Sequence, residues 1–500
     1  MRRLSQLLAN IDARPDAAPP DGYQVVGGDP EIRALTLDSR QAKAGTLFAT
    51  LPGSKHDGRA FITDALAQGA AAILTDQTFA AAAPEHIAVI HANEPRRLLA
   101  KLAAVFYETQ PAHIAAITGT NGKTSTAQFL REIGTHCGAR AASVGTLGII
   151  GPDKSDYGTL TTPDAITLHK ILAELAAGGV THAALEASSH GLKQYRLDGV
   201  KIDAAGFTNL TRDHLDYHGT MEKYYAAKTR LFDHVLPPHG TAVLNADAPE
   251  SEDLAERASR RGCRILTYGQ NGKDLRLLDL APHGHGQNLR LEILGRKHDA
   301  MLNIAGRFQA WNALCALGLA IGQGAEPELA IAALPRLTGV HGRLQRVAAH
   351  PNGAAIFVDY AHTPDALETV LRALRPHVDA ARQGRLAVVF GCGGNRDRGK
   401  RPVMGGIAQR LADIAIVTDD NPRFEEPAVI RAEILSGCQP APPVHEIGDR
   451  SQAIEFAIKK LQPGDILVIA GKGHEPGQII RDRILPFDDG QIARDIAGAS

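Results

Sequence analysis

The chain has 500 residues, of which 44% are hydrophobic and 22% are charged, and its formal net charge is -1 at pH 7. This length exceeds one hydrophobic core and suggests about three domains at ~150 residues each. The balanced charge gives no reason to expect nucleic acid or an anionic membrane as a partner. The five cysteines lack CxxC spacing, which argues against a disulfide framework or a zinc site and suits a reducing compartment.

The N-terminus does not fit a signal peptide. The apolar residues that follow Met1 are soon interrupted by Asn10, Asp12 and Pro15. No run of about 18 apolar residues occurs anywhere, so we expect no membrane insertion. We therefore expect a cytoplasmic protein, and we expect it to be a monomer.

The first segment, residues 1–111, is typical of a small α/β unit. Short apolar stretches alternate with turn signals such as Pro52-Gly53. Ser39 and the polar loop 54–58, which begins Ser54-Lys55-His56, could hold a ligand. Both are also explained by turn chemistry, because Ser, Asp and Gly are common turn formers.

The second segment, residues 112–336, begins with a phosphate-loop pattern. An apolar run ends at Thr118, glycines at 119 and 122 then bracket a tight loop, and apolar residues recur at helical spacing from Ala127. The order strand, loop, helix presents N–H groups to an anion. Lys123 would reach the β- and γ-phosphates, and Thr124 would place its hydroxyl on Mg²⁺. Only two residues separate the glycines where the general pattern has four, so the alternative is an ordinary glycine-rich turn.

Later apolar runs of this segment end in polar clusters. Glu186 ends one run, the cluster 208–216 follows another, and Asn245 follows a third. The carboxyl edge of a parallel sheet, where such clusters gather, is where open α/β sheets bind ligands. Glu186, His214 and Thr124 could hold Mg²⁺ there, because a carboxylate that ends a buried strand needs a partner. His214 alone is equally explained as a surface or packing residue.

Two further stretches of the second segment carry predictions. Residues 274–304 alternate between apolar and polar and predict an antiparallel addition. Lys228 follows a helical pattern, and spacing alone predicts a solvent-exposed helix lysine.

The third segment, residues 337–500, repeats the arrangement of apolar runs and polar loops. It predicts a Rossmann-like domain, but without GxGxxG it does not imply NAD. One glycine-rich loop forms a cationic site suited to carboxylates or phosphates and contains Arg396, Arg398, Lys400 and Arg401. Arg423 is a second cationic group, and Glu475 could accept a substrate ammonium. The alternative is that these charges pair with one another at the surface.

Six motifs appear in one order along the chain. They are Gly119-Thr120-Asn121-Gly122-Lys123-Thr124, Glu186-Ala187-Ser188-Ser189-His190-Gly191-Leu192, Asn209-Leu210-Thr211-Arg212-Asp213-His214-Leu215-Asp216-Tyr217-His218, Ala227-Lys228, Asp359-Tyr360-Ala361-His362-Thr363-Pro364-Asp365 and Gly471-Lys472-Gly473-His474-Glu475. Together they resemble the Mur ligases, and the resemblance runs from about residue 37 to residue 489. Within that family it is nearest to the member that adds the third residue of the peptidoglycan peptide.

The resemblance implies three domains and a reaction. The domains are an N-terminal UDP-binding domain at 1–111, a central ATPase with a mostly parallel sheet at 112–336, and a Rossmann-like amino-acid domain at 337–500. ATP would phosphorylate the γ-carboxylate of D-glutamate in UDP-N-acetylmuramoyl-L-alanyl-D-glutamate. The amine of meso-diaminopimelate would then attack the acyl phosphate, giving the amide, ADP and phosphate.

The resemblance also implies site residues. The ATP contacts would be Gly119, Thr120, Asn121, Gly122, Lys123, Thr124, Ser125, Asn312, Arg343 and Asp359. The UDP-substrate contacts would be Leu37, Ser39, Thr161, Thr162, Ser188, Gln194 and Arg196. The amino-acid contacts would be Arg396, Asp420, Asn421, Pro422, Arg423, Gly471 and Glu475. The catalytic set would be Lys123, Glu186, His214 and Lys228, and Mg²⁺ would be held by Thr124, Glu186, His214 and an N6-carboxylated Lys228.

The form Asp420-Asn421-Pro422-Arg423 is associated in the family with meso-diaminopimelate rather than L-lysine. Arg423 and Arg396 can bind the extra carboxylate that lysine lacks, and a site with donors awaiting that group rejects the analogue. The chain departs from the family pattern in four places. Asn395 replaces a usual Asp, and Gln309 replaces a usual Asn. Glu475 is followed by Pro476 and by Gly477, which stands where an aromatic is common, and the loop Ser54-Lys55-His56 also differs.

Three alternatives remain open. An L-lysine-adding ligase is the rival within the family, and the form Asp420-Asn421-Pro422-Arg423 speaks against it. A folylpolyglutamate synthetase shares the ATPase motifs, but the segment Leu37-Asp38-Ser39-Arg40 speaks against it. A phosphate-loop NTPase that switches a partner would need no amino-acid pocket, so the cationic loops of the third segment favour a ligase.

Overall fold

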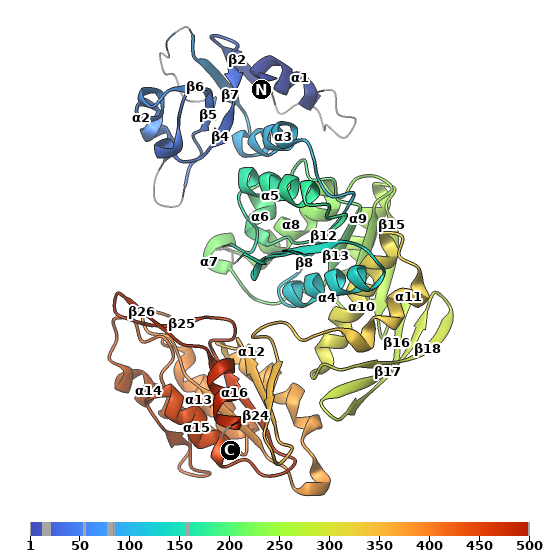
Figure 1. Ribbon diagram of the computed structural model, residues 1–500, viewed down its shortest axis with the longest axis vertical. Coiled ribbons are helices and arrows are strands. Elements are labelled where there is room, and N and C mark those ends of the chain that lie inside the picture. The colour runs from blue at the N-terminus through green and yellow to red at the C-terminus, as the bar shows by residue number, and fades with distance from the viewer. Residues whose placement is uncertain are drawn as a thin grey trace. The chain divides into compact units, whose positions relative to one another are not determined.

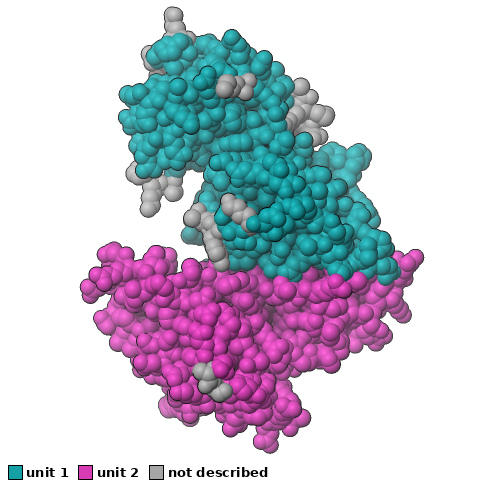
Figure 2. All heavy atoms as spheres, in the orientation of Figure 1, with its two compact units in different colours: residues 1–276, 314–330 teal, residues 277–313, 331–500 magenta. Residues whose placement is uncertain are grey.

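The computed structural model describes residues 2–12, 22–53, 57–77, 84, 86–153, 155–156 and 160–498. The chain forms two compact units, which Figure 2 shows in different colours: unit 1 is residues 1–276 and 314–330, and unit 2 is residues 277–313 and 331–500. The loop Ser54-Lys55-His56 lies outside the described residues. None of the described helices combines the length and the hydropathy needed to cross a bilayer. The domain boundaries at 111 and 336 stay a prediction.

The first part of unit 1 is a small α/β sheet of strand order β2-β7-β6-β5-β4, as predicted. Strands β4 to β7 are parallel and β2 is antiparallel to β7. Ile166 of the next part joins the apolar core of this sheet, so both parts belong to one unit. The elements are β1 (Arg2–Arg3), α1 (Leu4–Asp12), β2 (Tyr23–Val26), β3 (Glu31–Ile32), β4 (Ala34–Thr36), η1 (Ser39–Gln41), β5 (Thr46–Ala49), η2 (Gly58–Phe61), α2 (Ile62–Ala67), β6 (Ala70–Asp76), β7 (Ala88–Ala92) and α3 (Pro95–Tyr107).

The second part of unit 1 is built on a parallel sheet with β8 near its middle (Figure 1). Strands β9, β12, β8, β13, β14 and β15 run parallel in that order. A parallel sheet is covered on both faces, which is why its strands appear in the sequence as continuous apolar runs. The elements are β8 (His113–Thr118), α4 (Lys123–His136), β9 (Ala141–Gly145), β10 (Gly148–Ile150), β11 (Ser155–Asp156), α5 (Ala165–Ala177), β12 (His182–Glu186), α6 (Ser189–Lys193), β13 (Ala204–Phe207), α7 (Leu215–His218), α8 (Met221–Arg230), η3 (Leu231–Val235), β14 (Thr241–Asn245), α9 (Ser251–Arg260), β15 (Arg264–Gly269) and β16 (Leu275–His283).

The predicted order of strand, tight loop and helix is present between β8 and α4. Gly119 and Gly122 have φ of +146° and +89°, values that L side chains rarely adopt. A Cβ atom on Gly119 would lie 1.9 Å from Thr208 Oγ1, so no larger residue fits there. The glycines therefore fix the backbone of the loop at the carboxyl edge of the sheet.

Unit 2 contains the predicted Rossmann-like sheet, of order β19-β20-β24-β21-β22-β23. All neighbours are parallel except β19, which is antiparallel to β20. Val468 and Ile469 are consecutive in β24 and belong to separate apolar cores, because successive strand residues face opposite sides. Strands β17 and β18 are antiparallel, as predicted for residues 274–304.

The remaining elements complete unit 2, except α10 and α11, which cross the division between the units, as β16 does between residues 276 and 277. They are β17 (Gly286–Ile293), β18 (Arg296–Leu302), α10 (Arg307–Gly322), α11 (Pro327–Ala332), η4 (Leu334–Arg336), β19 (Gln345–Ala349), β20 (Ala355–Asp359), α12 (Pro364–Leu374), η5 (Arg375–His377), η6 (Ala380–Arg382), β21 (Leu386–Phe390), α13 (Lys400–Leu411), β22 (Ile414–Val417), α14 (Pro427–Leu435), β23 (His445–Glu446), α15 (Arg450–Lys459), β24 (Ile466–Ala470), β25 (Gly477–Ile480), β26 (Arg483–Pro486) and α16 (Asp489–Gly498).

Candidate functional site

The loop between β8 and α4 is held in place by the segment that follows β13. Thr120 N donates to Asn209 O at 2.8 Å, and Asn121 N donates to Asn209 Oδ1 at 2.9 Å. Thr208 Oγ1 donates to Asn121 O at 2.6 Å. The first N–H groups of α4 have no partner within their own helix, and together with the helix dipole they form an anion site.

Lys123, the first residue of α4, folds back over this loop. Its Nζ donates to Gly119 O at 2.9 Å and to Thr120 O at 2.8 Å. The ammonium group therefore lies where the loop would hold a phosphate, which is the position expected of a phosphate-loop lysine.

Glu186 ends β12 next to the start of α4. Its side chain is buried and accepts hydrogen bonds from Thr124 Oγ1 at 3.0 Å, Thr146 N at 2.8 Å and Thr146 Oγ1 at 3.1 Å. Burial raises the pKa of Glu186, and the nearby charge of Lys123 opposes that rise. A buried carboxylate beside a hydroxyl offers the hard oxygen ligands that Mg²⁺ prefers, so Thr124 and Glu186 fit a metal site.

Lys228 is buried, so the solvent-exposed helix lysine predicted from spacing alone is wrong. Its exposed fraction is 1%, its Nζ donates to Gly119 O at 2.7 Å, and it lies 4.4 Å from the centroid of the Tyr224 ring. Tyr224 and Lys228 are four residues apart on α8 and so share the helix face that meets the loop. Burial, and then the charge of Lys123, lower the pKa of Lys228 well below its usual value.

His214 lies at the N-terminus of α7 with φ of +52° and is half exposed. Its ring centroid is 5.0 Å from that of His190 and 6.1 Å from that of Tyr224. Within the described ranges, no three His, Cys, Asp or Glu side chains are grouped as a metal site. Of the four predicted magnesium ligands, the structure therefore brings Thr124 and Glu186 into contact. No hydrogen bond described here joins His214 or Lys228 to that pair.

Five predicted substrate residues form one network that reaches Glu186. Thr162 Oγ1 donates to Glu186 O at 2.7 Å and lies 3.0 Å from Ser188 Oγ. Arg196 Nη1 donates to Thr162 O at 2.5 Å, and Arg196 Nη2 donates to Gln194 Oε1 at 2.8 Å. The fifth member, Thr161, is 3.1 Å from Thr146, which itself contacts Glu186.

Arg196 is the cationic member of this network. It forms no ion pair with any described carboxylate, and burial lowers its pKa. A half-buried guanidinium that has no ion-pair partner among the described residues suits an anionic ligand, although the charge of Asp164 partly opposes the effect of burial on its pKa. We call this network the anion-binding wall, because its guanidinium could hold an anion next to the phosphate loop.

Leu37 and Ser39 follow β4 in the first sheet of unit 1. Leu37 is exposed, whereas Ser39 is buried at the start of η1, where Asp38 caps the turn. No described hydrogen bond joins either residue to the network around Glu186.

The other predicted ATP residues lie in unit 2. Asp359 ends β20, is buried, and accepts hydrogen bonds from Leu344 N and Ala361 N, both at 2.7 Å. Burial raises the pKa of Asp359, and the charge of Arg343 opposes the rise. Arg343 stacks 4.4 Å from the Tyr360 ring, a flat surface that the sequence did not single out. Asn312, on α10, donates to Gln309 Oε1 at 2.9 Å.

The prediction that four cations of one loop form a ligand site is wrong for Arg398 and Arg401. Arg401 is fully buried and pairs with Glu425 and Glu433, and Arg398 also pairs with Glu433. Arg401 is paired in the interior and Arg398 at the surface, and their partners Glu425 and Glu433 are not among the charges that the alternative of mutual pairing named. Lys400 Nζ donates to His362 O at 2.7 Å.

Arg396 and Arg423 keep uncompensated charges. Arg396 is exposed and makes no hydrogen bond or ion pair with a described residue. Arg423 Nη1 donates to Gly394 O at 3.1 Å and to Asn421 O at 3.4 Å, with no carboxylate partner among the described residues. Backbone carbonyls thus hold the Arg423 guanidinium while leaving its charge for a ligand.

Glu475 is already partnered. Asn421 Nδ2 donates to Glu475 Oε2 at 2.8 Å, and Lys472 Nζ lies 3.4 Å from the same atom. Lys472 is fully buried and was not predicted as a site residue, although it lies within a quoted motif. Gly471, with φ of +115°, faces Asp420, whose Oδ2 would be 2.5 Å from a Cβ atom there. Asp420, Asn421, Gly471 and Glu475 are therefore brought together.

The departures from the family pattern have local physical reasons. Asn395 has φ of +52°, a conformation that Asn tolerates well, and its Oδ1 accepts from Phe424 N at 3.1 Å. A Cβ atom on Gly477 would lie 2.6 Å from Ile484 Cγ2, so no aromatic residue fits there. Gln309 is buried and partners Asn312.

A parallel α/β sheet with a phosphate loop, a buried carboxylate and an anion-binding wall at one edge defines a nucleotide-binding α/β protein. Comparisons with known proteins give its family. The Mur ligase family catalytic domain matches residues 31–107, the Mur ligase middle domain matches residues 117–320, and the Mur ligase glutamate ligase domain matches residues 342–473. The chain belongs to the Mur ligase family.

Relatives at high identity carry one name, UDP-N-acetylmuramoyl-L-alanyl-D-glutamate–2,6-diaminopimelate ligase. The protein of that name from Caulobacter vibrioides is 52% identical and aligns over 92% of this chain and 94% of its own length. That from Bradyrhizobium diazoefficiens is 51% identical, with 92% and 93% covered. A solved structure with the same name has a TM-score of 0.72 at 36% identity and covers 94% of this chain and 95% of its own. A MurF ligase from Thermotoga maritima in complex with ADP, at 20% identity and TM-score 0.59, shares the fold.

Proposed function

We propose that the protein, as a cytoplasmic monomer, adds meso-diaminopimelate to the D-glutamate γ-carboxylate of UDP-N-acetylmuramoyl-L-alanyl-D-glutamate, with ATP converted to ADP and phosphate. The observation that carries the proposal is the hydrogen-bond chain from Thr124 through Glu186 to Thr162 and Arg196. It joins a phosphate site to an anion-binding wall, which is what transfer of a phosphoryl group to a carboxylate requires.

The chemistry proceeds in two steps. A carboxylate oxygen attacks the γ-phosphorus, an O–P bond forms, the bond to the β-phosphate oxygen breaks, and ADP leaves. The amine then attacks the acyl carbon, a C–N bond forms, the bond to the phosphate oxygen breaks, and the amine gives up a proton. Phosphorylation matters because a carboxylate is a poor electrophile until it carries a leaving group.

The residues of unit 1 have distinct roles in this proposal. The N-terminus of α4 and Lys123 would bind the phosphates and offset the charge on the transferring group. Arg196 would orient the acceptor carboxylate. Thr124, Glu186, His214 and a modified Lys228 would hold Mg²⁺, which neutralises phosphate charge when bound.

Lys228 would act as a carbamate. Its burial favours the neutral amine, the form that can attack CO2: a C–N bond forms and a proton passes to solvent. The product would be a carboxylate-bearing group next to the loop. It would supply the oxygen ligand that the unmodified side chains around Glu186 lack.

Amino-acid selection would lie with unit 2. Arg423 and Arg396, whose charges have no described carboxylate partner, would bind the carboxylate that meso-diaminopimelate has and L-lysine lacks. Asp420 and Asn421 would orient the amino acid, and Glu475 would act through its contacts with Asn421 and Lys472.

Parallel product assays test the proposal. The protein would be incubated with ATP, Mg²⁺, the nucleotide dipeptide and one of meso-diaminopimelate, L-lysine or L-glutamate, and products would be identified by mass spectrometry. We expect the diaminopimelate adduct to dominate. A dominant lysine adduct would identify the lysine-adding ligase instead, and a glutamate adduct would point to the folate-type enzyme.

A further inference from the structure

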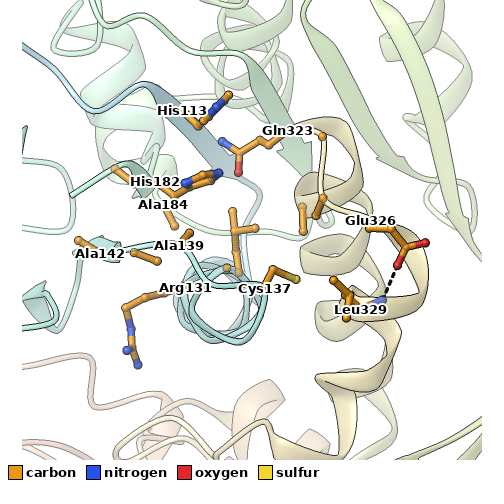
Figure 3. A pocket seen from close by; sticks show the side chains of 17 residues that line it. His113, Arg131, Cys137, Ala139, Ala142, His182, Ala184, Gln323, Glu326 and Leu329 are labelled. Atoms are coloured by element: carbon orange, nitrogen blue, oxygen red, sulfur yellow. Dashed lines mark hydrogen bonds between the residues drawn. The ribbon is translucent and has the colours of Figure 1, made fainter. Parts of the chain in front are cut away.

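A second cavity lies in unit 1, at the end of the sheet opposite the phosphate loop. Its volume is about 400 Å³, and it is lined by residues from the starts of β8, β9 and β12, the last two turns of α4 and the segment 320–329 (Figure 3). His113 is the first residue of β8 and Thr118 the last, so the strand places ~17 Å between this cavity and the phosphate loop, at ~3.3 Å per residue. The cavity is therefore outside the site described above.

The polar wall of the cavity includes His113 and Gln323, and both bond to Asp203, a residue outside the lining. His113 Nδ1 donates to Asp203 Oδ2 at 2.8 Å, and Gln323 Nε2 donates to Asp203 Oδ1 at 2.9 Å. Because the Gln323 nitrogen must face the carboxylate, its carbonyl oxygen faces away from it. That oxygen has no hydrogen-bond partner among the described residues. Figure 3 shows the side chains of His113, His182 and Gln323 together on this wall.

The same wall holds two imidazole rings. The ring centroids of His113 and His182 are 4.5 Å apart with an interplanar angle of 29°, so the rings are stacked. Burial, and then the charge of His113, lower the pKa of His182, which keeps that ring neutral at pH 7. The remaining lining is largely apolar and includes Leu130, Ala184 and Leu329.

These features select a ligand class. The volume is that of a small-molecule pocket and is too small for a folded segment of protein. Apolar walls beside two aromatic rings favour a flat aromatic group. The lining carries one carboxylate, Glu326, and one guanidinium, Arg131, so it has no excess charge that would select an ion. The side-chain oxygen of Gln323 can accept a hydrogen bond from a ligand donor.

We propose that this cavity binds a small, neutral, planar aromatic molecule whose N–H donates to the side-chain oxygen of Gln323. The ligand would contact the C-terminal half of α4, the helix whose first residue is Lys123. The inference does not depend on the proposed ligase reaction.

Cys137 supplies a direct readout in the unmodified protein, because it lines the cavity and is half-buried. Indole, which is planar and has one N–H, is the probe. The rate at which iodoacetamide alkylates Cys137 would be followed by peptide mass spectrometry. We expect the rate to fall about tenfold when indole is at about ten times its Kd, since only the free protein reacts.

Three controls make the test specific. Cys438 lies in unit 2, is also half-buried, and has a pKa that burial raises as it does that of Cys137, so its rate should not change. Benzofuran has the shape of indole with an oxygen in place of the N–H and should protect Cys137 at least fivefold less at equal concentration. Gln323→Leu, which removes the acceptor, should abolish the difference between the two probes.

Three results would overturn the proposal: no protection of Cys137 by indole, equal slowing of Cys137 and Cys438, or equal protection by indole and benzofuran. None of these readouts requires nucleotide or turnover. The outcome of this test is therefore independent of the outcome of the ligase assay.

Discussion

At the scale of single residues, burial moves two ionisable groups beside the phosphate loop in opposite directions. It raises the pKa of Glu186 and lowers the pKa of Lys228, so each is pushed toward its neutral form. Each side chain nevertheless has a hydrogen-bond partner: Glu186 accepts from Thr124 Oγ1, and Lys228 donates to Gly119 O. A metal ion would offset part of that desolvation cost for Glu186, and it would do the same for an anionic carbamate on Lys228.

The role of Lys228 predicts a rescue experiment. Lys228→Ala should reduce kcat by at least about 100-fold, because the oxygen ligand is lost, and formate or acetate should restore part of the rate. The measurement is ADP release with both substrates present. Lys223→Ala, on the exposed face of the same helix, is the matched control and should retain full activity. Full activity of Lys228→Ala would exclude the carbamate.

Arg423 predicts a change in selectivity. Arg423→Lys keeps the charge but loses the two-pronged geometry that matches a carboxylate, so KM for meso-diaminopimelate should rise by about tenfold or more. KM for ATP should not change. Arg372→Lys, at an exposed pair on α12, is the control for loss of a guanidinium. An unchanged KM for meso-diaminopimelate would remove Arg423 from the amino-acid site.

Because of His218, we expect the free energy of unfolding to fall in acid. Burial lowers its pKa to about 4, and its Nδ1 is buried without a partner. Between pH 6.5 and about 4, the unfolded chain binds a proton that the folded chain does not, so the free energy of unfolding falls as the pH falls. The loss is roughly 2 to 3 kcal/mol and is complete below the folded pKa.

Calorimetry across that pH range checks this expectation. The Tm of His218→Gln should fall less steeply than that of the unaltered protein between pH 6.5 and 4. His86→Gln, at an exposed histidine, should follow the unaltered protein. Parallel curves for all three proteins would contradict the assignment to His218.

At the scale of elements, the sequence predicted what depends on local pattern. The strands before Gly119, Glu186 and Asp359 were recognisable because a strand covered on both faces is continuously apolar. The loop was recognisable because only glycine adopts the φ values at positions 119 and 122. Pro364 is the first residue of α12, a position that proline favours in helices.

The pattern could not show which side chains meet across the fold. Thr146 follows β9 and contacts Glu186 from 40 positions away, with no local signal. Arg401 looked like a ligand-binding cation but is buried between Glu425 and Glu433, which lie 24 and 32 positions further on. Burial of Lys228 likewise depends on which face of α8 meets the loop, and spacing alone does not determine that face.

Gly145, the last residue of β9, is a position where we expect substitution to reduce both activity and stability. A Cβ atom on Gly145 would lie 2.1 Å from Glu186 Oε1, so Gly145→Ala must displace the carboxylate. We expect kcat to fall at least about tenfold and stability to fall by about 1 to 3 kcal/mol from overpacking. Gly178→Ala is the matched control, because Gly178 has a φ of -75° and a Cβ atom there would come no closer than 3.4 Å to its neighbours. Normal activity of Gly145→Ala would show that the position of Glu186 is not critical.

At the scale of the whole molecule, the predicted nucleotide contacts are divided between the units. The phosphate loop and the anion-binding wall belong to unit 1, whereas Asn312, Arg343, Asp359 and the amino-acid residues belong to unit 2. A motif identifies residues that are close in sequence. It therefore cannot predict which of the two compact units contains each residue. The order of motifs along the chain nevertheless gave the family, because that order does not depend on the arrangement of the units.

The proposed reaction predicts how ATP turnover depends on the other substrates. A ligase that activates a carboxylate has no use for water as an acceptor, so phosphate release should require both the nucleotide dipeptide and the amino acid. With the dipeptide alone, we expect at most one ADP per protein molecule, because the acyl phosphate has no amine to react with. Addition of meso-diaminopimelate should then start continuous turnover. Steady release of phosphate from ATP alone, at a rate comparable to that with both substrates, would instead support a phosphate-loop NTPase that switches a partner.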